Sequence, residues 1–434
     1  MRVSETVEPR GSRRWLDGGD FGIRREHLTT TASCAARRAA TTLGAARPVE
    51  EQSVEVSKQP RDPEPRGLRI LIVNGGYLTA TPSGGDRHLL ALAGGLAAHQ
   101  AVARVIYVAP EAVRPWLAPG VDARLYRSAP SRTTLGAVAR YLARLLQVAA
   151  RLREVGAVDV VLVSPGLVDL LPAAWTRLRG ARVGVFAYHL GDVRAAGAVR
   201  RPLQAVLSRL ADLPARWLLR RANHVFTAVR EVVDQLVASG VERRRIVIQR
   251  PIVEVEAIRA APAFAAPELE APDVLFVGRL VARKGVFDLL TAAHGLDATV
   301  GLVGEGEEAP ALERRIADEG LTHVRLLGGL SDPEVFGLMR AARVLVLPSY
   351  EEGYGLVLAE ALVAGTPAIA YALPHYDEVF GDAVEQVARG DVDALRRALA
   401  RRLAESPVEN VPAIDVTTRR TAAAQIVGLV GEVS

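Results

Sequence analysis

The chain has 434 residues, of which 49% are hydrophobic and 24% charged, so it is long enough to form two or three globular domains. A single cysteine, Cys34, excludes an internal disulfide and a metal site made of several cysteines, and no apolar run reaches the roughly 18 residues that span a bilayer. The formal charge of +5 is too close to neutral to indicate nucleic-acid binding by itself. We therefore expect a cytoplasmic protein with no nucleic-acid partner.

Residues 1–66 carry 12 basic and 10 acidic side chains, show no helical or strand periodicity and end in a proline-spaced run. This composition is typical of a disordered extension. The segment has no apolar core of a secretory signal, but residues 28–49 are free of acidic residues and rich in Arg, Thr and Ala, as transit peptides are. An inert tail and a targeting segment are the two interpretations that the composition allows.

From residue 67 onward, short apolar runs alternate with segments of helix length, and this alternation predicts βαβ units on a parallel sheet. One helix is predicted over residues 87–98 and another over 230–239, where Gly240 follows as a C-terminal cap. The predicted strands of this first series are LRILIVN (68–74), ARVIYVAP (103–110), VDVVLVSP (158–165), ARVGVFAYH (181–189), HVFTAV (224–229) and RIVIQR (245–250).

A proline-interrupted stretch, residues 251–272, breaks this pattern and predicts a domain boundary. A second series of strands follows at DVLFVGRL (273–280), ATVGLVGEG (298–306), VRLLGG (324–329), ARVLVLPS (342–349) and TPAIAYA (366–372). The fold class is thus α/β, with two doubly wound, Rossmann-like domains over 67–252 and 253–413 that face each other across a ligand-binding cleft. We expect residues 414–434 to form a C-terminal helix that crosses back toward the first domain.

The segment PSYEEGYGLVLAEALVAGTPAIA, residues 348–370, is the most informative motif. A buried strand leads through a loop with two glutamates and two glycines into a helix, whose N-terminus therefore opens at the edge of the sheet. Glycines there allow close approach of an anion such as a diphosphate, which the helix dipole favours. Glu352 and Glu360, eight residues apart, suit the vicinal hydroxyls of ribose and hexose. Alternatively, Glu352 caps the helix and Glu360 is a solvated helix residue.

The segment VGRLVARKGV places Arg279 and Lys284 five residues apart after a predicted strand. Two cations at the carboxyl end of a strand suit a diphosphate whose negative charge grows as it leaves. Lys284 is the only lysine beyond residue 58 in this arginine-rich chain, so chance is a weak explanation of its position. The alternative interpretation is a pair of solvated surface cations.

Together these segments resemble the retaining glycosyltransferases of the GT-B fold, most specifically glycosyltransferase family 4. The resemblance covers residues 67–434 in organisation and is strongest over 273–370. VGRLVARKGV is similar to the family's diphosphate motif, GLVGEGEE to its nucleotide-facing glycine loop and EEGYGLVLAE to its paired-glutamate motif. The resemblance implies that Arg279 and Lys284 hold the donor diphosphate during catalysis and that Glu360 binds the ribose hydroxyls.

The same resemblance assigns the loop residues of these motifs. It implies that Glu352 contacts the transferred sugar and takes part in catalysis, together with the amides of Gly353, Tyr354 and Gly355. Gly304 would face the nucleotide from the glycine loop. These are expectations that follow from the family motif at matching positions.

Two further positions of the resemblance lie in the first predicted domain. TPSGGDRHLLALA is similar to the family's Gly-Gly loop, which implies that Gly84 and Gly85 touch the donor phosphate or the acceptor. VGVFAYHLGD ends where the family has a cleft histidine, which implies a catalytic His189 near the reacting carbon. Taken alone, the glycines also suit a tight turn before a helix, and the histidine suits a structural role.

Two departures from the family pattern concern contacts other than the donor-binding charges. The family usually has an Asn-Gly pair after the strand that here reads VIQRPIV, so the hinge contacts at Arg250 and Pro251 differ. It often has a Gly-Gly pair after the last strand, where this chain has Ala372, Leu373, Pro374 and His375.

Other classes of function fit the residues less well. The loop NGGYLTATPSGG does not place GxGxxG between strand and helix, as a dinucleotide-dependent oxidoreductase requires. A zinc enzyme is disfavoured because the eight histidines are scattered, and Asp391 and Asp393 suit a helix N-cap better than a metal site. The remaining alternative is a catalytically degenerate GT-B subunit that binds and stabilises an active partner.

The sequence therefore predicts a hexosyltransferase that uses a nucleoside diphosphate sugar and an acceptor hydroxyl on a glycan, a lipid-linked molecule or a small molecule. No cofactor and no metal are expected, since two cations occupy the role of a divalent ion. Between residues 190 and 230, eight arginines and Trp217 stand against two aspartates. This indicates either an amphipathic helix packed on its own sheet or a peripheral contact with the cytoplasmic membrane face.

Overall fold

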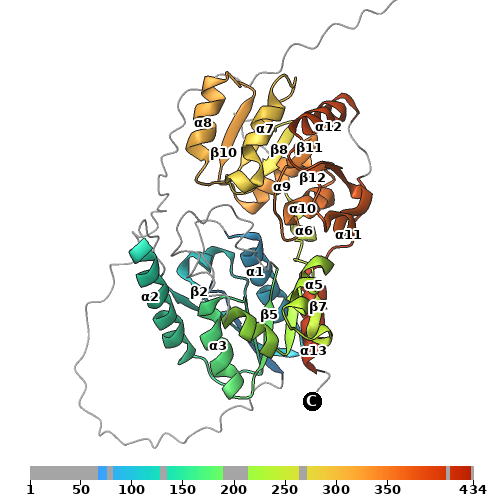
Figure 1. Cartoon of the computed structure of the whole chain (residues 1–434). Helices are drawn as coiled ribbons and strands as arrows, with labels where there is room; N and C mark the ends of the chain where they lie inside the picture. The colour runs from blue at the N-terminus through green and yellow to red at the C-terminus, as the bar shows by residue number, and fades with distance from the viewer. Residues whose placement is uncertain are drawn as a thin grey trace, which may run out of the picture. The chain divides into compact units, whose positions relative to one another are not determined.

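The structure is a computed structural model that describes residues 67–75, 82–127, 134–188, 214–262, 271–406 and 411–431. The extension predicted over residues 1–66 and the predicted catalytic His189 lie outside the described residues. The described parts of residues 66–434 belong to one compact unit, which contains two parallel β-sheets (Figure 1). The expected α/β class with two doubly wound sheets is thus confirmed.

The first sheet has seven strands in the order β3-β2-β1-β4-β5-β6-β7, all paired in parallel. Its strands are β1 (Leu68–Val73), β2 (Val102–Pro110), β3 (Val121–Tyr126), β4 (Val160–Val163), β5 (Arg182–Phe186), β6 (His224–Thr227) and β7 (Ile246–Ile248). The strand order reverses between β1 and β4, and doubly wound sheets bind ligands beyond the carboxyl ends of the strands at such a point.

The second sheet has six parallel strands in the order β10-β9-β8-β11-β12-β13. Its strands are β8 (Val274–Val277), β9 (Val300–Val303), β10 (Val324–Gly328), β11 (Val344–Leu347), β12 (Ala368–Tyr371) and β13 (Val384–Val387). Here the order reverses between β8 and β11, so the loops after these two strands meet at the same edge.

Helices cover the sheets. Those of the first sheet are α1 (Gly84–Ala97), α2 (Thr134–Leu152), α3 (Leu167–Leu178), α5 (Arg230–Ala238) and α13 (Arg419–Gly431). The others are α6 (Val255–Ala260), α7 (Val286–Ala293), α8 (Ala309–Asp318), α9 (Asp332–Ala341), α10 (Leu356–Ala364), α11 (Tyr376–Phe380) and α12 (Val392–Ala404). Short 3-10 turns are η1 (Glu111–Trp116), η2 (Arg243–Arg245), η3 (Ala282–Lys284) and η4 (Gly381–Ala383).

Strand β1 shows why the first sheet needs helices on both faces. Ile70 and Ile72 belong to the apolar cluster that contains α1 and α13. Leu71 and Val73 belong to the cluster that contains residues of α2, α3 and α5. Successive side chains of a strand point to opposite faces, so a strand covered on both sides is apolar throughout, as LRILIV nearly is.

Helix α1 begins three residues earlier than predicted. Ser83 caps it: the Ser83 hydroxyl accepts from the Asp86 amide, and the Asp86 carboxylate accepts from the Ser83 amide at 2.9 Å. The prediction placed Gly84 and Gly85 in a loop before the helix, but a capping box stabilises the first turn around them. The two glycines thus lie on the helix itself.

Two edge strands, β3 and β13, were not predicted. Strand β3 reads VDARLY and is only partly buried over its first four residues, while β13 reads VEQV and is buried only at Val384. Charged residues on these edges break the apolar run that identifies a central strand.

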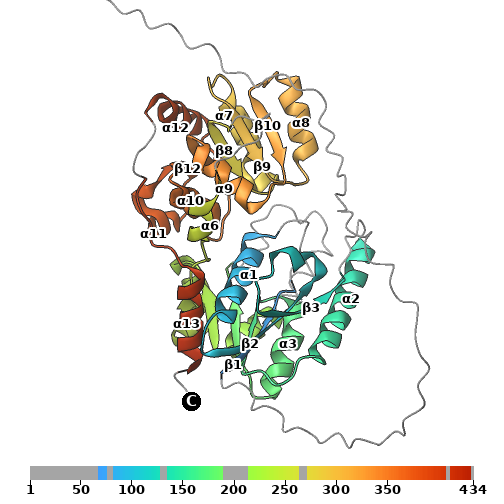
Figure 2. The ribbon, with the colours of Figure 1, turned by 180° about the vertical axis from the view of Figure 1, so that it is seen from behind.

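The last helix packs against the first one. Figures 1 and 2 show α13 beside α1, and its buried residues Ala422, Ala423 and Ile426 join the apolar cluster that α1 forms with β1. Just before α13, a parallel β-bridge between Ile252 and Thr417 connects this end of the chain to the segment after β7. Among the described residues, no helix is both long enough and apolar enough to span a bilayer.

Candidate functional site

One pocket of about 810 Å³ collects the predicted motifs. It is bounded by the loops after β8, β9 and β11 and by the first turns of α1 and α10. Ten of the eleven residues predicted for the site line it, and the eleventh, His189, lies outside the described residues. The ten are Gly84, Gly85, Arg279, Lys284, Gly304, Glu352, Gly353, Tyr354, Gly355 and Glu360.

The paired-glutamate segment folds as a strand, a loop and a helix, as predicted. Helix α10 begins after Gly355, which has φ +88°, and ends at Gly365, which has φ +84°. Because both caps are left-handed, glycine is the residue that fits them without strain. Glu352 lies on the loop, while Glu360 lies on α10 and is only 2% exposed. Burial excludes the interpretation of Glu360 as a solvated helix residue.

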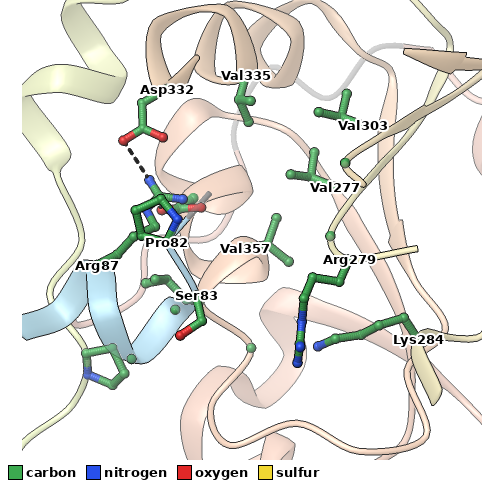
Figure 3. A pocket seen from close by; sticks show the side chains of 18 of the residues that line it. Pro82, Ser83, Arg87, Val277, Arg279, Lys284, Val303, Asp332, Val335 and Val357 are labelled. Atoms are coloured by element: carbon green, nitrogen blue, oxygen red, sulfur yellow. Dashed lines mark ion pairs between the residues drawn. The ribbon is translucent and has the colours of Figure 1, made fainter. Parts of the chain in front are cut away.

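The two predicted cations converge on one side of the pocket, as Figure 3 shows. Arg279 follows β8, and Lys284 ends the turn η3. The Lys284 ammonium forms an ion pair with Glu352, and both side chains are 14% exposed. Burial lowers the pKa of Lys284, and the charge of Glu352 opposes this shift. The lysine is therefore a partly desolvated cation held against a carboxylate, not a freely solvated one.

Gly285 brings the cation loop and the glutamate loop into contact. Its φ is +67°, and a Cβ built on it would lie 1.9 Å from the Pro348 carbonyl oxygen. The Tyr350 amide also donates to the Arg283 carbonyl at 2.9 Å. The backbones of the two loops touch here because glycine has no side chain to separate them. Lys284 and Glu352, which lie on these loops, can therefore form their ion pair.

Gly304 has a similar function on the neighbouring strand. It has φ +135°, and a Cβ would lie 1.9 Å from the Gly278 carbonyl oxygen. The loops after β8 and β9 can therefore meet only with glycine at this position. The apolar wall beyond them consists of Val277, Val303 and Val335 (Figure 3).

Arg87 was not predicted, and it occupies the side of the pocket away from Lys284 (Figure 3). Its guanidinium lies 3.1 Å from Glu360 Oε1 and 3.2 Å from Asp332 Oδ2. Burial raises the pKa of Glu360, and the charge of Arg87 opposes this shift. One signal was available in the sequence: a cation in the first turn of a helix opposes the helix dipole, which points to a partner elsewhere.

Trp116, Tyr188 and Arg283 are among the other lining residues that were not predicted. Trp116 ends η1 and is 36% exposed, and Tyr188 immediately precedes the undescribed segment that contains His189. Isolated aromatic residues at strand or turn ends carry no spacing signal, so the sequence could not distinguish them from core residues.

Tyr354 forms part of the pocket wall. Its ring centroid lies 5.9 Å from that of Phe380, and burial raises the pKa of its hydroxyl to about 12. Among the described residues, none hydrogen-bonds this hydroxyl. Tyr354 is therefore a neutral donor beside the loop of Glu352.

The family departures also appear in the structure. Pro251 lines the pocket, and His375 is buried with Nδ1 3.6 Å from Glu231 Oε2 of α5. Burial lowers the pKa of His375, while Glu231 opposes this shift. At this position, where the resembled family often has a Gly-Gly pair, the chain thus has a polar contact with α5.

Only part of the basic segment over 190–230 is described. Residues 214–221 are helical, with Trp217 47% exposed and the Arg221 guanidinium 5.6 Å from its ring centroid. Arg220 donates to the Ser239 carbonyl at 2.8 Å. Four of the eight arginines lie outside the described residues.

The chain is similar to known proteins over part of its length. Residues 259–413 match the family described as glycosyl transferases group 1. The chain is 31% identical over 226 residues to 2-deoxystreptamine glucosyltransferase of Streptomyces kanamyceticus, which covers 47% of the chain and 58% of that protein. It is 35% identical over 156 residues to phosphatidyl-myo-inositol mannosyltransferase of Mycobacterium leprae, which covers 34% and 41%. The chain thus spans less than two thirds of these relatives.

Solved structures share the fold. Anabaena Alr3699/HepE, determined in complex with UDP and glucose, superimposes with a TM-score of 0.59 at 16% identity and covers 84% of this chain and 98% of its own. Sucrose-phosphate synthase of Thermosynechococcus elongatus superimposes with a TM-score of 0.62 at 19% identity and covers 84% and 94%. The two-sheet GT-B architecture expected from the sequence is therefore confirmed.

Proposed function

We propose that this protein is a glycosyltransferase that moves a sugar from a nucleoside diphosphate sugar to an acceptor hydroxyl. The observation that carries the proposal is the convergence of Arg279, Lys284 and Glu352 at the start of α10, in one pocket with the buried Glu360. The group 1 match over residues 259–413 contains all four side chains. The UDP and glucose bound by Anabaena Alr3699/HepE support a nucleotide-sugar donor.

In this proposal the cations bind the donor diphosphate. Arg279 can hold two phosphate oxygens with its planar fork, Lys284 adds a point charge, and the N-terminus of α10 adds its dipole. Negative charge grows on the diphosphate as its bond to the sugar breaks, so these fixed positive groups stabilise the transition state more than the bound donor. When the donor binds, Glu352 loses its ion pair with Lys284 and accepts hydrogen bonds from the hydroxyls of the sugar.

We propose transfer with retention, as family 4 enzymes perform it. The bond between sugar C1 and the diphosphate oxygen breaks, and the acceptor oxygen bonds to C1 on the same face. The acceptor proton passes to the departing diphosphate oxygen, so no side chain need be a strong base. The catalytic role of His189 near C1 stays a prediction. The alternative function is a catalytically degenerate subunit that only binds, and the experiment described next distinguishes it from an active enzyme.

The first experiment is a thermal-shift screen of UDP-, GDP- and ADP-sugars with the full chain. A ligand at 100 times its dissociation constant adds about 2.7 kcal/mol to the unfolding free energy, which a thermal shift resolves easily. Sugars that bind are then assayed for slow hydrolysis and for transfer. Binding without hydrolysis or transfer would support the degenerate subunit, and the lack of any nucleotide-sugar shift would contradict both.

We also propose that transfer needs no divalent metal ion, because Arg279 and Lys284 supply positive charge at the diphosphate. Turnover is expected to be the same in excess EDTA as in added magnesium chloride. A loss of turnover in EDTA that magnesium or manganese restores would contradict this proposal.

For the acceptor, we propose a lipid-linked molecule presented at the cytoplasmic membrane face. Support comes from exposed Trp217 beside Arg216 and Arg221, since each basic residue near an anionic bilayer adds about 1 kcal/mol. Sedimentation with vesicles should show binding that needs anionic lipid and weakens with salt. The quadruple change of Arg200, Arg201, Arg216 and Arg220 to Gln should weaken this binding. Equal binding to neutral and anionic vesicles, or to neither, would favour a soluble acceptor.

A further inference from the structure

The carboxylate of Glu360 is buried between two parts of the chain that lie far apart in sequence. It lies on α10, is 2% exposed and lines the pocket. Its Oε1 atom is 3.1 Å from the Arg87 guanidinium, which comes from the first turn of α1 and therefore from the helices of the first sheet. A buried carboxylate is stable only when charges or hydrogen bonds compensate its lost hydration.

Arg87 is itself fixed by three contacts. Its Nη2 atom lies 3.2 Å from Asp332 Oδ2 at the start of α9, as the dashed line in Figure 3 marks. Its guanidinium carbon lies 5.9 Å from the Phe336 ring centroid. A guanidinium that touches two carboxylates and a ring has little freedom to turn, so it holds Glu360 in one orientation.

We propose that Arg87 is a positioning residue for ribose recognition: by holding Oε1 of Glu360, it turns the other carboxylate oxygen toward the ribose hydroxyls of the bound nucleotide. The inference rests on the proposed function and goes beyond it, since the residue belongs to α1 and not to the matched segment over 259–413. Recognition of the ribose then requires the helix that begins at Gly84 and Gly85, next to the diphosphate.

The charges that face Glu360 explain why an arginine is needed. Asp332 from α9 and Glu254 at the start of α6 both raise the pKa of Glu360, in addition to burial, and Arg87 from α1 opposes them. Without Arg87, the carboxyl group would take up a proton at a higher pH. A protonated carboxyl has lost an acceptor site, so the hydroxyl contact would weaken as the pH falls.

Calorimetric titration of the full chain with nucleoside diphosphates and their 2′-deoxy forms tests this role. The probes are UDP, GDP and ADP, each paired with its 2′-deoxy analogue. We expect the parent to bind at least one ribose form about tenfold or more tightly than its deoxy form, since a hydrogen bond to a charged group contributes about that much. In Arg87→Gln this ratio should fall to about threefold or less.

Two variants separate positioning from a merely structural effect. Arg104→Gln removes an exposed ion pair with Asp122 outside the pocket and should keep the parent's ratio. Asp332→Asn keeps an oxygen acceptor for Arg87 and removes one of the charges that raise the pKa of Glu360, so it should keep the parent's ratio although it breaks an ion pair of the same arginine. A second readout is pH: the preference of Arg87→Gln for the ribose form should fall at a higher pH than the preference of the parent, because loss of Arg87 removes the charge that opposes the raised pKa of Glu360.

The outcomes are distinct. If Arg87→Gln keeps the parent's ratio, or if Asp332→Asn loses it, the positioning role is wrong while the proposed function stands. The positioning role is also wrong, and the proposed function stands, if the parent binds a nucleoside diphosphate but does not prefer the ribose form over its 2′-deoxy form. If the parent binds none of the three nucleotides, the proposed function fails as well. Should Arg87→Gln not fold, Arg87→Lys keeps the charge but loses the fork, and it should reduce the ratio partly.

Discussion

Lys284 and Glu352 form an ion pair with each other, although both are proposed to bind the donor. A diphosphate carries more charge than one carboxylate and can draw Lys284 away from Glu352, which frees the carboxylate for sugar hydroxyls. Donor binding would thus exchange one ion pair for two new contacts.

Replacing Lys284 by Ala is expected to lower turnover by about 100-fold to 1,000-fold, because loss of one donor from a preorganised charge site typically has this effect. Steady-state kinetics with the donor found by screening measure it. Arg401→Ala, which removes an exposed ion pair with Glu385, is the control and should retain parent rates. Turnover of Lys284→Ala near that of the control would contradict the assignment of the lysine.

Asp169 is a buried carboxyl at the first turn of α3, and burial raises its pKa to about 8. In the unfolded chain the pKa of an aspartate is about 3.9, so the folded protein holds a proton that the unfolded chain has released. The stabilising effect is complete at acidic pH and is lost as the pH rises through about 8.

We therefore expect the free energy of unfolding to decrease between pH 5 and pH 9, and Asp169→Asn to remove much of that decrease. Denaturant titrations at pH 5, 7 and 9 measure both slopes. Asp159→Asn serves as the comparison, because Arg69 lowers the pKa of Asp159 and its contribution therefore has the opposite sign. An unchanged slope in Asp169→Asn would show that this carboxyl is ionised in the fold.

Among the elements, the loop between β11 and α10 was predicted nearly to the residue, whereas the start of α1 was not. Gly355 and Gly365 mark both ends of α10 because each has a positive φ that other residues avoid. Gly84 and Gly85 were instead placed in the loop before α1, since glycine is also common in turns that precede a helix. The side-chain cap from Ser83 decided between these possibilities, and its geometry is visible only in the structure.

Gly285 offers a test of how closely the two site loops must meet. Gly285→Ala combines φ +67° with a contact of 1.9 Å to the Pro348 carbonyl, whereas Gly295→Ala combines φ +75° with open space. A left-handed alanine by itself costs about 1–2 kcal/mol. We expect Gly295→Ala to show that loss alone, and Gly285→Ala to lose more stability and at least tenfold in turnover. Equal losses in unfolding free energy and turnover would refute the close contact.

At the scale of the whole molecule, the sequence predicted the site residues of the second sheet and Gly84 and Gly85 of α1, but it missed Arg87. The residues of the second sheet stand in contiguous motifs, so spacing alone groups Arg279 with Lys284 and Glu352 with Glu360. Arg87 meets its partner across more than half of the chain, and nothing local marks that contact. Burial of Glu360 is likewise a property of assembled helices and cannot be found from the motif.

His88 makes another contact between residues that lie far apart in the sequence. It is fully buried on α1, accepts a hydrogen bond from the Ile252 amide at 3.1 Å through Nδ1, and packs edge-on against Phe186 and Tyr188. Burial lowers its pKa to about 3. The unfolded chain has a histidine pKa of about 6.5, so stability is complete above that pH and is lost as the pH falls toward 3.

We expect His88→Phe to remove this acid dependence between pH 6.5 and pH 4 while it lowers stability at pH 7 by about 1–3 kcal/mol, because the Ile252 amide loses its acceptor. Urea unfolding at pH 4, 6.5 and 7 measures the free energy of unfolding of the parent and the variant. An acid slope in His88→Phe that equals the parent's would contradict a neutral buried His88.

The packing of α13 on α1 and β1 has a consequence for synthesis of the protein. Ile70 and Ile72 leave the ribosome well before Ala422, Ala423 and Ile426, which complete the same apolar cluster. At about 5–20 residues per second, the roughly 350 residues between β1 and α13 take roughly 20 to 70 seconds to translate. During that interval one face of the first sheet lacks the cover of α13, so the nascent chain offers an apolar surface to chaperones until α13 has been synthesised.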